Sequence, residues 1–292
     1  MGLFNKKPKR VALVLGGGAT RGLAHIGVIK AFEENGIEFD YVAGTSVGSL
    51  IGAFYAAGYT SAQMEEMAKG LKAKDIKKGL IPFTPSKTDG IKKLVKSHIG
   101  DIDVSDLKKP FCGVAVDVKT GNEIHFTKGN LANVVAGSCA VPGVFYPVEE
   151  GEYLLYDGGI MNNIPSNVPK VVWDCDAVVA VDVNSTRGQG TQSEKFLDTV
   201  MASIQIMMKS NSVKGYLHGD IVIQPDLKRF KATKLDFVDE MIAEGYNAAM
   251  YNMDKIKMLL NGKLKKYLKK ELKAKRELYS WWKKKTNYGE SW

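Results

Sequence analysis

The chain has 292 residues, of which 45% are hydrophobic and 25% are charged, and its net charge is +9. This composition is typical of a globular chain that can bury a large core. We expect no membrane span, because no apolar run approaches the ~20 residues that a span needs. We also expect no signal peptide, because the basic residues 1–10 are followed by the short apolar stretch 11–15 alone.

The first predicted element is the apolar strand 11–15, which runs into Gly16-Gly17-Gly18-Ala19-Thr20-Arg21-Gly22 and a helix over 22–34. Glycine amides in such a loop can turn their N–H groups toward a developing oxyanion, and losing one such donor typically costs ~3 kcal/mol. A dinucleotide-binding loop is the alternative. It is disfavoured because Asp40 precedes the second strand, whereas a dinucleotide fold needs an acidic residue at the end of that strand.

The second predicted unit is a strand over 41–43, the turn Gly44-Thr45-Ser46-Val47-Gly48 and a helix over 49–57. A serine between glycines at a strand-to-helix turn is typical of a nucleophile elbow, where the hydroxyl is lifted out of the sheet. The alternative is a tight turn that only closes the strand. The loops of the two units are expected at one edge of a parallel sheet, so the first glycine loop would face Ser46.

A nucleophilic serine needs a base, and none of the four histidines is convincing. His218 alone follows the chain order of a serine, acid, histidine triad, and we interpret it as an ordinary loop residue. Asp157 is the better candidate, because it ends the apolar strand 153–156 and precedes Gly158-Gly159. Partial desolvation there would raise the pKa of Asp157 and make it a stronger base. The alternative is an Asp-Gly turn.

The remaining pattern is a hairpin over 111–118 and 122–126, strands over 177–181 and 221–223, and helices over 193–212 and 237–260. Strands alternating with helices predict a mostly parallel sheet covered on both faces, a three-layer α/β/α fold. Met201, Met207 and Met208 are expected in the core. Asp182 ends the strand 177–181 as a second carboxylate on the same edge, and a structural role is expected for it.

These motifs together resemble the bacterial patatin-like phospholipases, which use a Ser-Asp dyad without histidine. The blocks at Gly16–Gly22, at Gly44–Gly48 and at Asp157-Gly158-Gly159 resemble the family's oxyanion loop, nucleophile elbow and Asp-Gly-Gly/Ala motif, in the same order. A fourth block over 138–147 resembles the segment leading to the dyad aspartate. From its residues, that block either walls an acyl pocket or packs in the core.

The resemblance implies a patatin-like fold and a lipid ester substrate, with Ser46 as nucleophile and Asp157 as base. The expected oxyanion donors are the amides of Gly16, Gly17, Gly18 and Val47. The residues expected to support the motifs are Arg21, Gly22, Gly44, Gly48, Gly158 and Gly159. Arg21 either meets a substrate phosphate or, as we favour, pins its loop by bonding carbonyl groups.

The C-terminal segment carries the positive charge, with 13 Lys/Arg against three Asp/Glu from Lys255 onward. Leu260, Leu264, Tyr267, Leu268, Leu272, Tyr279 and Trp282 recur in it at helical spacing. We therefore divide the chain into a hydrolase domain, 1–255, and a basic amphipathic helix, 256–292, that binds an anionic membrane surface. Docking on the domain is one alternative. A nucleic-acid arm is disfavoured by the interleaved aromatic residues, so no nucleic acid is expected as a partner.

The sequence thus predicts a cytoplasmic serine acyl hydrolase that cleaves carboxyl esters of phospholipids or lysophospholipids and approaches the inner membrane leaflet. The alternatives are a non-catalytic lipid-binding or regulatory adaptor and an esterase assisted by His218. Three scattered cysteines, Cys112, Cys139 and Cys175, fit a reducing compartment. No spacing predicts metal ligands, so no metal and no cofactor are expected. The sequence leaves the oligomeric state open.

Overall fold

A computed structural model of the chain describes residues 10–70, 85–184, 196–230 and 236–264. Within these residues an eight-stranded sheet has the order β5-β6-β3-β2-β1-β7-β8, with β4 also paired to β3. The strands are β1 Val11–Leu15, β2 Tyr41–Thr45, β3 Phe111–Asp117, β4 Asn122–Phe126, β5 Val148–Glu150, β6 Tyr153–Asp157, β7 Ala177–Val181 and β8 Ile221–Ile223.

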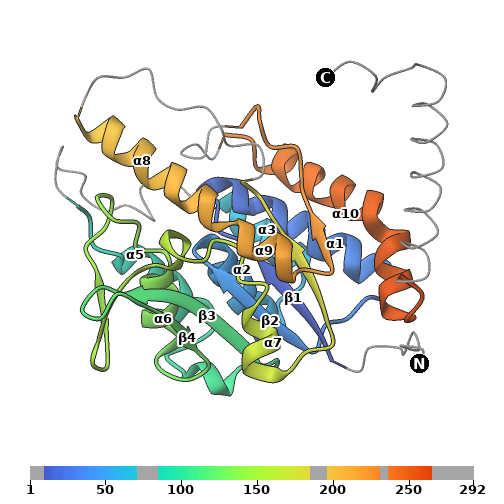
Figure 1. Ribbon diagram of the computed structural model, residues 1–292, viewed down its shortest axis with the longest axis horizontal. Coiled ribbons are helices and arrows are strands. Elements are labelled where there is room, and N and C mark those ends of the chain that lie inside the picture. Colours follow the sequence, from blue (N-terminus) through green and yellow to red (C-terminus); the bar gives the residue numbers. More distant parts are fainter. Residues whose placement is uncertain (1–9, 71–84, 185–195, 231–235, 265–292) are drawn as a thin grey trace, which may run out of the picture.

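The sheet is parallel through its centre and antiparallel at one side. Strands β3, β2, β1, β7 and β8 run parallel to one another, while β4, β5 and β6 join through antiparallel pairs. The hairpin of β3 and β4 and the mostly parallel α/β class predicted from the sequence are confirmed (Figure 1).

Helices cover both faces of the sheet (Figure 1). They are α1 Ala24–Glu34, α2 Val47–Ala57, α3 Ser61–Gly70, α5 Asp89–His98, α6 Leu131–Ser138, α7 Val168–Trp173, α8 Phe196–Asn211, α9 Val213–His218 and α10 Val238–Leu260, with short 3-10 turns η1 Ala19–Leu23, η2 Val104–Asp106 and η3 Gly158–Ile160. Successive residues of a strand point to opposite faces. Leu13 and Leu15 accordingly join a large core with α1, α2 and α10, whereas Ala12 and Val14 join a smaller one beside α7.

The structure extends and corrects several boundaries. Helix α2 begins directly after Ser46 rather than at residue 49, and Asp157 ends β6 as predicted. The short elements β5, α7 and α9 were not predicted, because three to six residues carry too little periodicity to separate a helix or strand from a loop. Met208 is buried as expected, but the prediction for Met207 was wrong, since that side chain is 51% exposed.

The C-terminal helix α10 crosses residue 255, where the sequence placed a domain boundary. Ile256 and Leu264 are buried in the larger core, so the chain up to Leu264 packs with the domain. The remainder of the predicted basic helix, residues 265–292, lies outside the described residues. None of the described helices combines the length and apolarity needed to cross a membrane.

Candidate active site

Ser46 stands at a sharp turn between β2 and α2. Its φ is +55° and its ψ is −128°, a conformation that costs a residue with a side chain on the order of 1–3 kcal/mol. Glycine is required on both sides of the turn. A Cβ at Gly44 would lie 2.3 Å from the carbonyl oxygen of Gly48, and a Cβ at Gly48 would lie 2.0 Å from that of Leu15. The turn therefore has the geometry of a nucleophile elbow.

Ser138, the last residue of α6, holds this strained turn in place. The Ser46 N–H donates to Ser138 Oγ over 2.9 Å, and the Ser138 hydroxyl donates in turn to the carbonyl oxygen of Val114 over 2.6 Å. The Ser46 carbonyl accepts from the first turn of α2, through the N–H groups of Ser49 and Leu50. The block over 138–147 thus contributes a polar anchor to the elbow.

Strand β3 brings the serine and the aspartate together. Thr45, the residue before Ser46, is paired with Val114, while Asp157 is paired with the next residue, Ala115. β2 is parallel to β3 and β6 is antiparallel to it, so the carboxyl ends of both strands arrive at neighbouring positions of β3. A Cβ at Gly158 would lie 2.3 Å from the Val114 carbonyl oxygen, and glycine is needed for the turn after Asp157 to pack this closely.

The Asp157 carboxylate is completely buried. Its Oδ1 accepts from the Gly159 N–H over 2.8 Å, and its Oδ2 has no hydrogen-bond partner among the described residues. Burial raises the pKa of Asp157 to about 6, although the Ser46 side chain and the Gly159 N–H both favour the charged form. The buried Cys139 thiol is a neighbour of both Ser46 and Asp157. Burial and the Asp157 charge raise its pKa well above the ordinary value, which keeps it protonated.

The glycine loop offers fewer free amides than the sequence predicted. The Gly16 N–H donates to the Val181 carbonyl and the Gly17 N–H to the Asn163 carbonyl, each over 3.0 Å. In this geometry both amides are engaged by the protein itself. The N–H groups of Gly18 and Val47 have no acceptor among the described residues. Of the four expected donors, these two are the ones left free to meet an oxyanion.

Two further residues of the loop have structural contacts. Arg21 donates from Nε over 2.9 Å and from Nη2 over 2.8 Å to the Phe230 carbonyl, and burial lowers the pKa of its guanidinium. It therefore ties the glycine loop to the segment that precedes α10. Gly22 packs against Val47, the residue after Ser46, since a Cβ at Gly22 would lie 2.3 Å from Val47 Cγ1.

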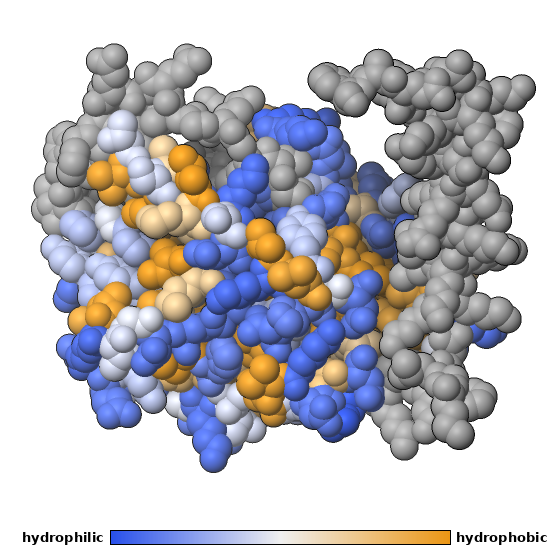
Figure 2. Space-filling model, viewed as in Figure 1, coloured by the Kyte–Doolittle hydropathy of each residue, from blue (hydrophilic) through white to orange (hydrophobic). Residues whose placement is uncertain are grey.

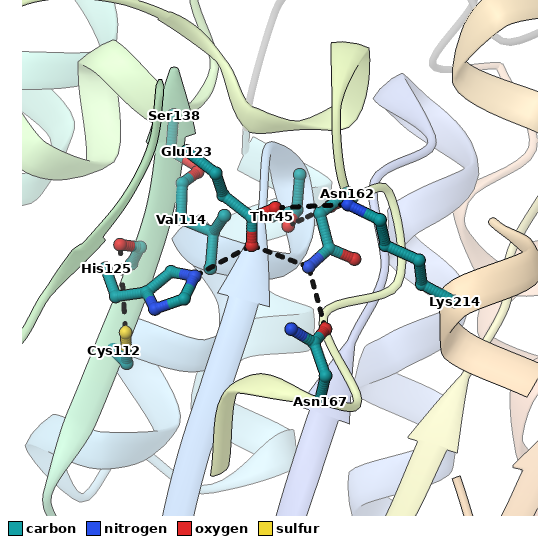
Figure 3. Close-up of polar contacts among 10 residues, drawn as sticks. Thr45, Cys112, Val114, Glu123, His125, Ser138, Asn162, Asn167 and Lys214 are labelled. Atoms are coloured by element: carbon teal, nitrogen blue, oxygen red, sulfur yellow. Dashed lines mark hydrogen bonds and ion pairs between the residues drawn. The ribbon is translucent and has the colours of Figure 1, made fainter. Parts of the chain in front are cut away.

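A polar network supports the elbow from β4 and from the chain after Asp157 (Figure 3). The Thr45 hydroxyl donates to the Asn162 carbonyl over 2.9 Å, and Asn162 Nδ2 donates to Glu123 Oε1 over 2.7 Å. Glu123 also contacts His125 Nε2 at 2.7 Å and Lys214 Nζ at 3.6 Å. Burial would raise the pKa of Glu123, but the hydrogen bonds from His125 and Asn162 outweigh it and hold the pKa below its ordinary value.

None of the histidines pairs with Ser46 or Asp157 among the described residues. His218 is exposed and precedes the amino end of β8, whereas Ser46 follows the carboxyl end of β2. Because β2 and β8 run parallel, the two residues lie at opposite ends of the strands. His25 is buried and its Nε2 lies 2.8 Å from the Gly16 carbonyl oxygen. Burial lowers the pKa of His25 to about 4, so it stays neutral and holds the glycine loop.

The polar residues that hold the site together were not predicted, namely Ser138, Asn162, Asn163 and Asn184. Asn162 and Asn163 carried a signal in the sequence, because two adjacent amides follow the Asp-Gly-Gly turn. In the structure both side chains are fully buried. Buried amides require partners, so their position predicts a structural hub. Among the described residues, no group of three or more His, Cys, Asp and Glu is arranged to hold a metal ion.

Comparison with known proteins agrees with this geometry. The patatin-like phospholipase family model matches residues 13–168, which include the glycine loop, the elbow and the Asp-Gly-Gly turn. An uncharacterized NTE family protein of Mycobacterium bovis is 35% identical over 181 residues, covering 61% of this chain and 50% of that protein. The chain thus spans about half the length of this relative.

Two further similarities concern a mammalian protein and a solved structure. Patatin-like phospholipase domain-containing protein 6 of Mus musculus is 34% identical over 198 residues, which cover 65% of this chain and 14% of that protein. The crystal structure of VipD from Legionella pneumophila matches 85% of this chain and 67% of its own, with a TM-score of 0.50 and 15% identity. The likeness to VipD concerns the fold alone.

Proposed function

The chain belongs to the patatin-like phospholipase family, and we propose on this premise that it is a serine lipid acyl hydrolase with Ser46 as nucleophile and Asp157 as its base. The observation that carries the proposal is the pairing of a strained, hydrogen-bonded serine turn with a fully buried carboxylate whose pKa is about 6. A base with this pKa is ionised at neutral pH and still accepts a proton in the transition state.

The reaction follows the two-step course of covalent acyl transfer. Asp157 takes the Ser46 proton as Oγ attacks the acyl carbonyl carbon, and the carbonyl electrons move onto the oxygen. The C–O bond to the leaving alcohol then breaks, and Asp157 returns the proton to that alcohol. Water adds to the acyl-enzyme with Asp157 again as base, and the fatty acid and Ser46 are released. The N–H groups of Gly18 and Val47 hold the oxyanion in both steps.

Exposed apolar side chains on α8 and α9, of which α8 packs against the turn after Asp157, support a lipid substrate of the phospholipid or lysophospholipid class. Helices α8 and α9 expose Ile206, Met207, Val213 and Leu217, seen as orange surface over these helices in Figure 2. The buried side of α8 reaches the turn after Asp157, because the Met208 methyl group lies 2.3 Å from the position that a Cβ at Gly159 would take.

The basic C-terminal segment is proposed as a second membrane contact. Charge reversal at Lys265, Lys266, Lys269, Lys270 and Lys273 in the full chain should release the protein from anionic vesicles while hydrolysis of a soluble ester continues. Unchanged vesicle binding would remove the segment from the proposal. Up to Leu264 the alternative is favoured, in which this segment docks on the domain, because the Leu264 side chain is buried in the core.

Labelling with a fluorophosphonate probe tests the hydrolase proposal. The wild type should be labelled, and Ser46→Ala and Asp157→Asn should not, with circular dichroism checking that all three are folded. His218→Ala serves as the control and should be labelled normally, since His218 lies at the other edge of the sheet. Absence of labelling in a folded wild type, with and without lipid vesicles, would favour the non-catalytic lipid-binding adaptor. Loss of labelling in His218→Ala would favour the histidine-assisted esterase.

A further inference from the structure

Two buried asparagine side chains converge on the carbonyl of Gly17. Asn184 Nδ2 donates to the Gly17 carbonyl oxygen over 2.6 Å, and Asn163 Nδ2 donates to the same oxygen over 3.3 Å. The backbone carbonyl oxygen of Asn163 also accepts a hydrogen bond from the Gly17 N–H. Both polar groups of Gly17 are therefore held, and they are held by loops that follow two different strands, β6 and β7.

The held carbonyl fixes the direction of the next amide. A peptide group is planar, and in a trans peptide the N–H points away from the C=O that precedes it. No cis peptide occurs among the described residues, so the Gly18 N–H points away from the two asparagines. That N–H has no acceptor among the described residues. Gly17 lies against Ser46, because a Cβ added at Gly17 would lie only 3.2 Å from Ser46 Cβ.

We propose that Asn163 and Asn184 are positioning residues that clamp the Gly17–Gly18 peptide so that the Gly18 N–H serves as an oxyanion donor beside Ser46. This inference rests on the hydrolase function proposed above. The clamp is needed because glycine has no side chain to restrict its backbone, and a rotated Gly17–Gly18 peptide would turn a carbonyl oxygen toward the oxyanion. A donor aimed in advance stabilises the transition state without reorganising when the charge develops.

The clamp has its own supports. Asp182 Oδ1 accepts the Asn184 N–H over 2.8 Å, and Tyr216 donates its hydroxyl to Asp182 Oδ2. Asn163 Nδ2 also contacts Ser212 Oγ at 3.4 Å. Asp182, the residue after β7, therefore has a structural role, because it holds the backbone of Asn184.

The orientation of the two amides follows from their surroundings. The Oδ1 atoms of Asn163 and Asn184 are buried without a hydrogen-bond partner among the described residues. Reversing either amide would place its oxygen against the Gly17 carbonyl oxygen, which is an acceptor only. The observed orientation is therefore the one in which each side chain gains a hydrogen bond to the loop.

Asn184→Asp tests the clamp, because it keeps the shape and removes both N–H donors. We expect kcat to fall at least tenfold with KM within a factor of two. The inhibition constant of an alkyl trifluoromethyl ketone, which forms an oxyanion on Ser46, should rise by the same factor as kcat/KM falls. Asn252→Asp is the matched control, since Asn252 Nδ2 also donates to a backbone carbonyl, that of Ala248, on the distant helix α10. It should leave both constants unchanged.

Asn184→Ser provides a neutral second variant. A double variant with Asn163→Ser should lose more activity than the two single losses multiplied together, because in each single variant the remaining asparagine still restrains the carbonyl in part. Unchanged ketone affinity in folded Asn184 variants would overturn the clamp, and so would equal losses in the affinities for ketone and substrate. Unfolding of both Asn184 variants would assign the pair to stability and also overturn it. Failure of the wild type to react with a fluorophosphonate would instead refute the hydrolase function.

Discussion

Replacement of Asp157 by Asn is expected to abolish turnover and, at neutral pH, to stabilise the folded protein. The carboxylate is fully buried and the pKa of Asp157 is raised from 3.8 to about 6, so the folded state holds its proton more tightly than the unfolded chain does. Above pH 6 the native protein therefore carries a buried charge that opposes folding. A neutral amide of the same shape keeps the Gly159 N–H as a partner and removes that charge.

The magnitude follows from the pKa difference. One pKa unit corresponds to about 1.4 kcal/mol, so the roughly two-unit rise opposes folding by about 3 kcal/mol above pH 6. The effect is absent below about pH 4, where both states bind the proton, and it grows as the pH rises from 4 to 6. Each kcal/mol corresponds to roughly 2–4 °C in Tm for a domain of about 200 residues, so Asp157→Asn should melt several degrees higher at pH 7.5.

Urea unfolding of both proteins between pH 4 and pH 8 measures this difference, provided that unfolding is reversible. The free energy of unfolding of Asp157→Asn should exceed that of the wild type increasingly from pH 4 to pH 6 and by a constant amount above it. Asp117→Asn is the matched control with the opposite sign, because hydrogen bonds from the Leu154 N–H and the Thr120 side chain lower the pKa of Asp117. A less stable Asp157→Asn at pH 7.5, or one with normal turnover, would refute the reasoning.

Four other predictions concern the site and its supports. The wild-type kcat/KM should fall about tenfold per pH unit below pH 6, as Asp157 becomes protonated, and a flat acid limb would remove it as the base. Ser46→Gly and Ser46→Ala should both be inactive. The free energy of unfolding of Ser46→Gly, measured with urea, should exceed that of Ser46→Ala by about 1 kcal/mol, because glycine tolerates the positive φ. Thr45→Val, which loses the hydrogen bond to the Asn162 carbonyl, should lower the free energy of unfolding by about 1–3 kcal/mol, whereas Thr45→Ser should stay near the wild type. Arg21→Lys should lower Tm by weakening the contact to Phe230, with the rate of probe labelling per folded molecule unchanged; slower labelling would place Arg21 in the reaction.

The part of the site that local sequence determines was predictable. The glycine loop, the Ser46 turn and Asp157 each depend on a few neighbouring residues and on the strand that precedes them, and each lies at the carboxyl end of its strand. That Ser46 and Asp157 lie near each other also depends on β6 being antiparallel to β3, which no local pattern encodes. The sequence predicted the Asp157 strand without its direction.

The supports of the site were not predictable in the same way, because they come from distant parts of the chain. Asn163 and Asn184 follow Gly17 by 146 and 167 residues, and Ser138 follows Ser46 by 92. Their side chains form hydrogen bonds only after the sheet is assembled. Distant parts of the chain also engage the amides of Gly16 and Gly17, which donate to the backbone carbonyls of Val181 and Asn163. An isolated glycine-rich loop would leave both amides free.

Several unfavourable features of the fold lie at the carboxyl end of the parallel strands, although Asp174 also has a positive φ and the buried hydroxyls of Ser86 and Ser166 also lack a partner among the described residues. Ser46 has a positive φ, Asp157 is a buried carboxylate, and the Oδ1 atoms of Asn163 and Asn184 are buried without a partner among the described residues. The rest of the domain tolerates them because β1 and β7 are buried along their whole length in apolar surroundings. A protein that only bound lipid would gain stability by relaxing any of the four. A strained serine turn beside a buried carboxylate with a raised pKa therefore favours catalysis over an adaptor role.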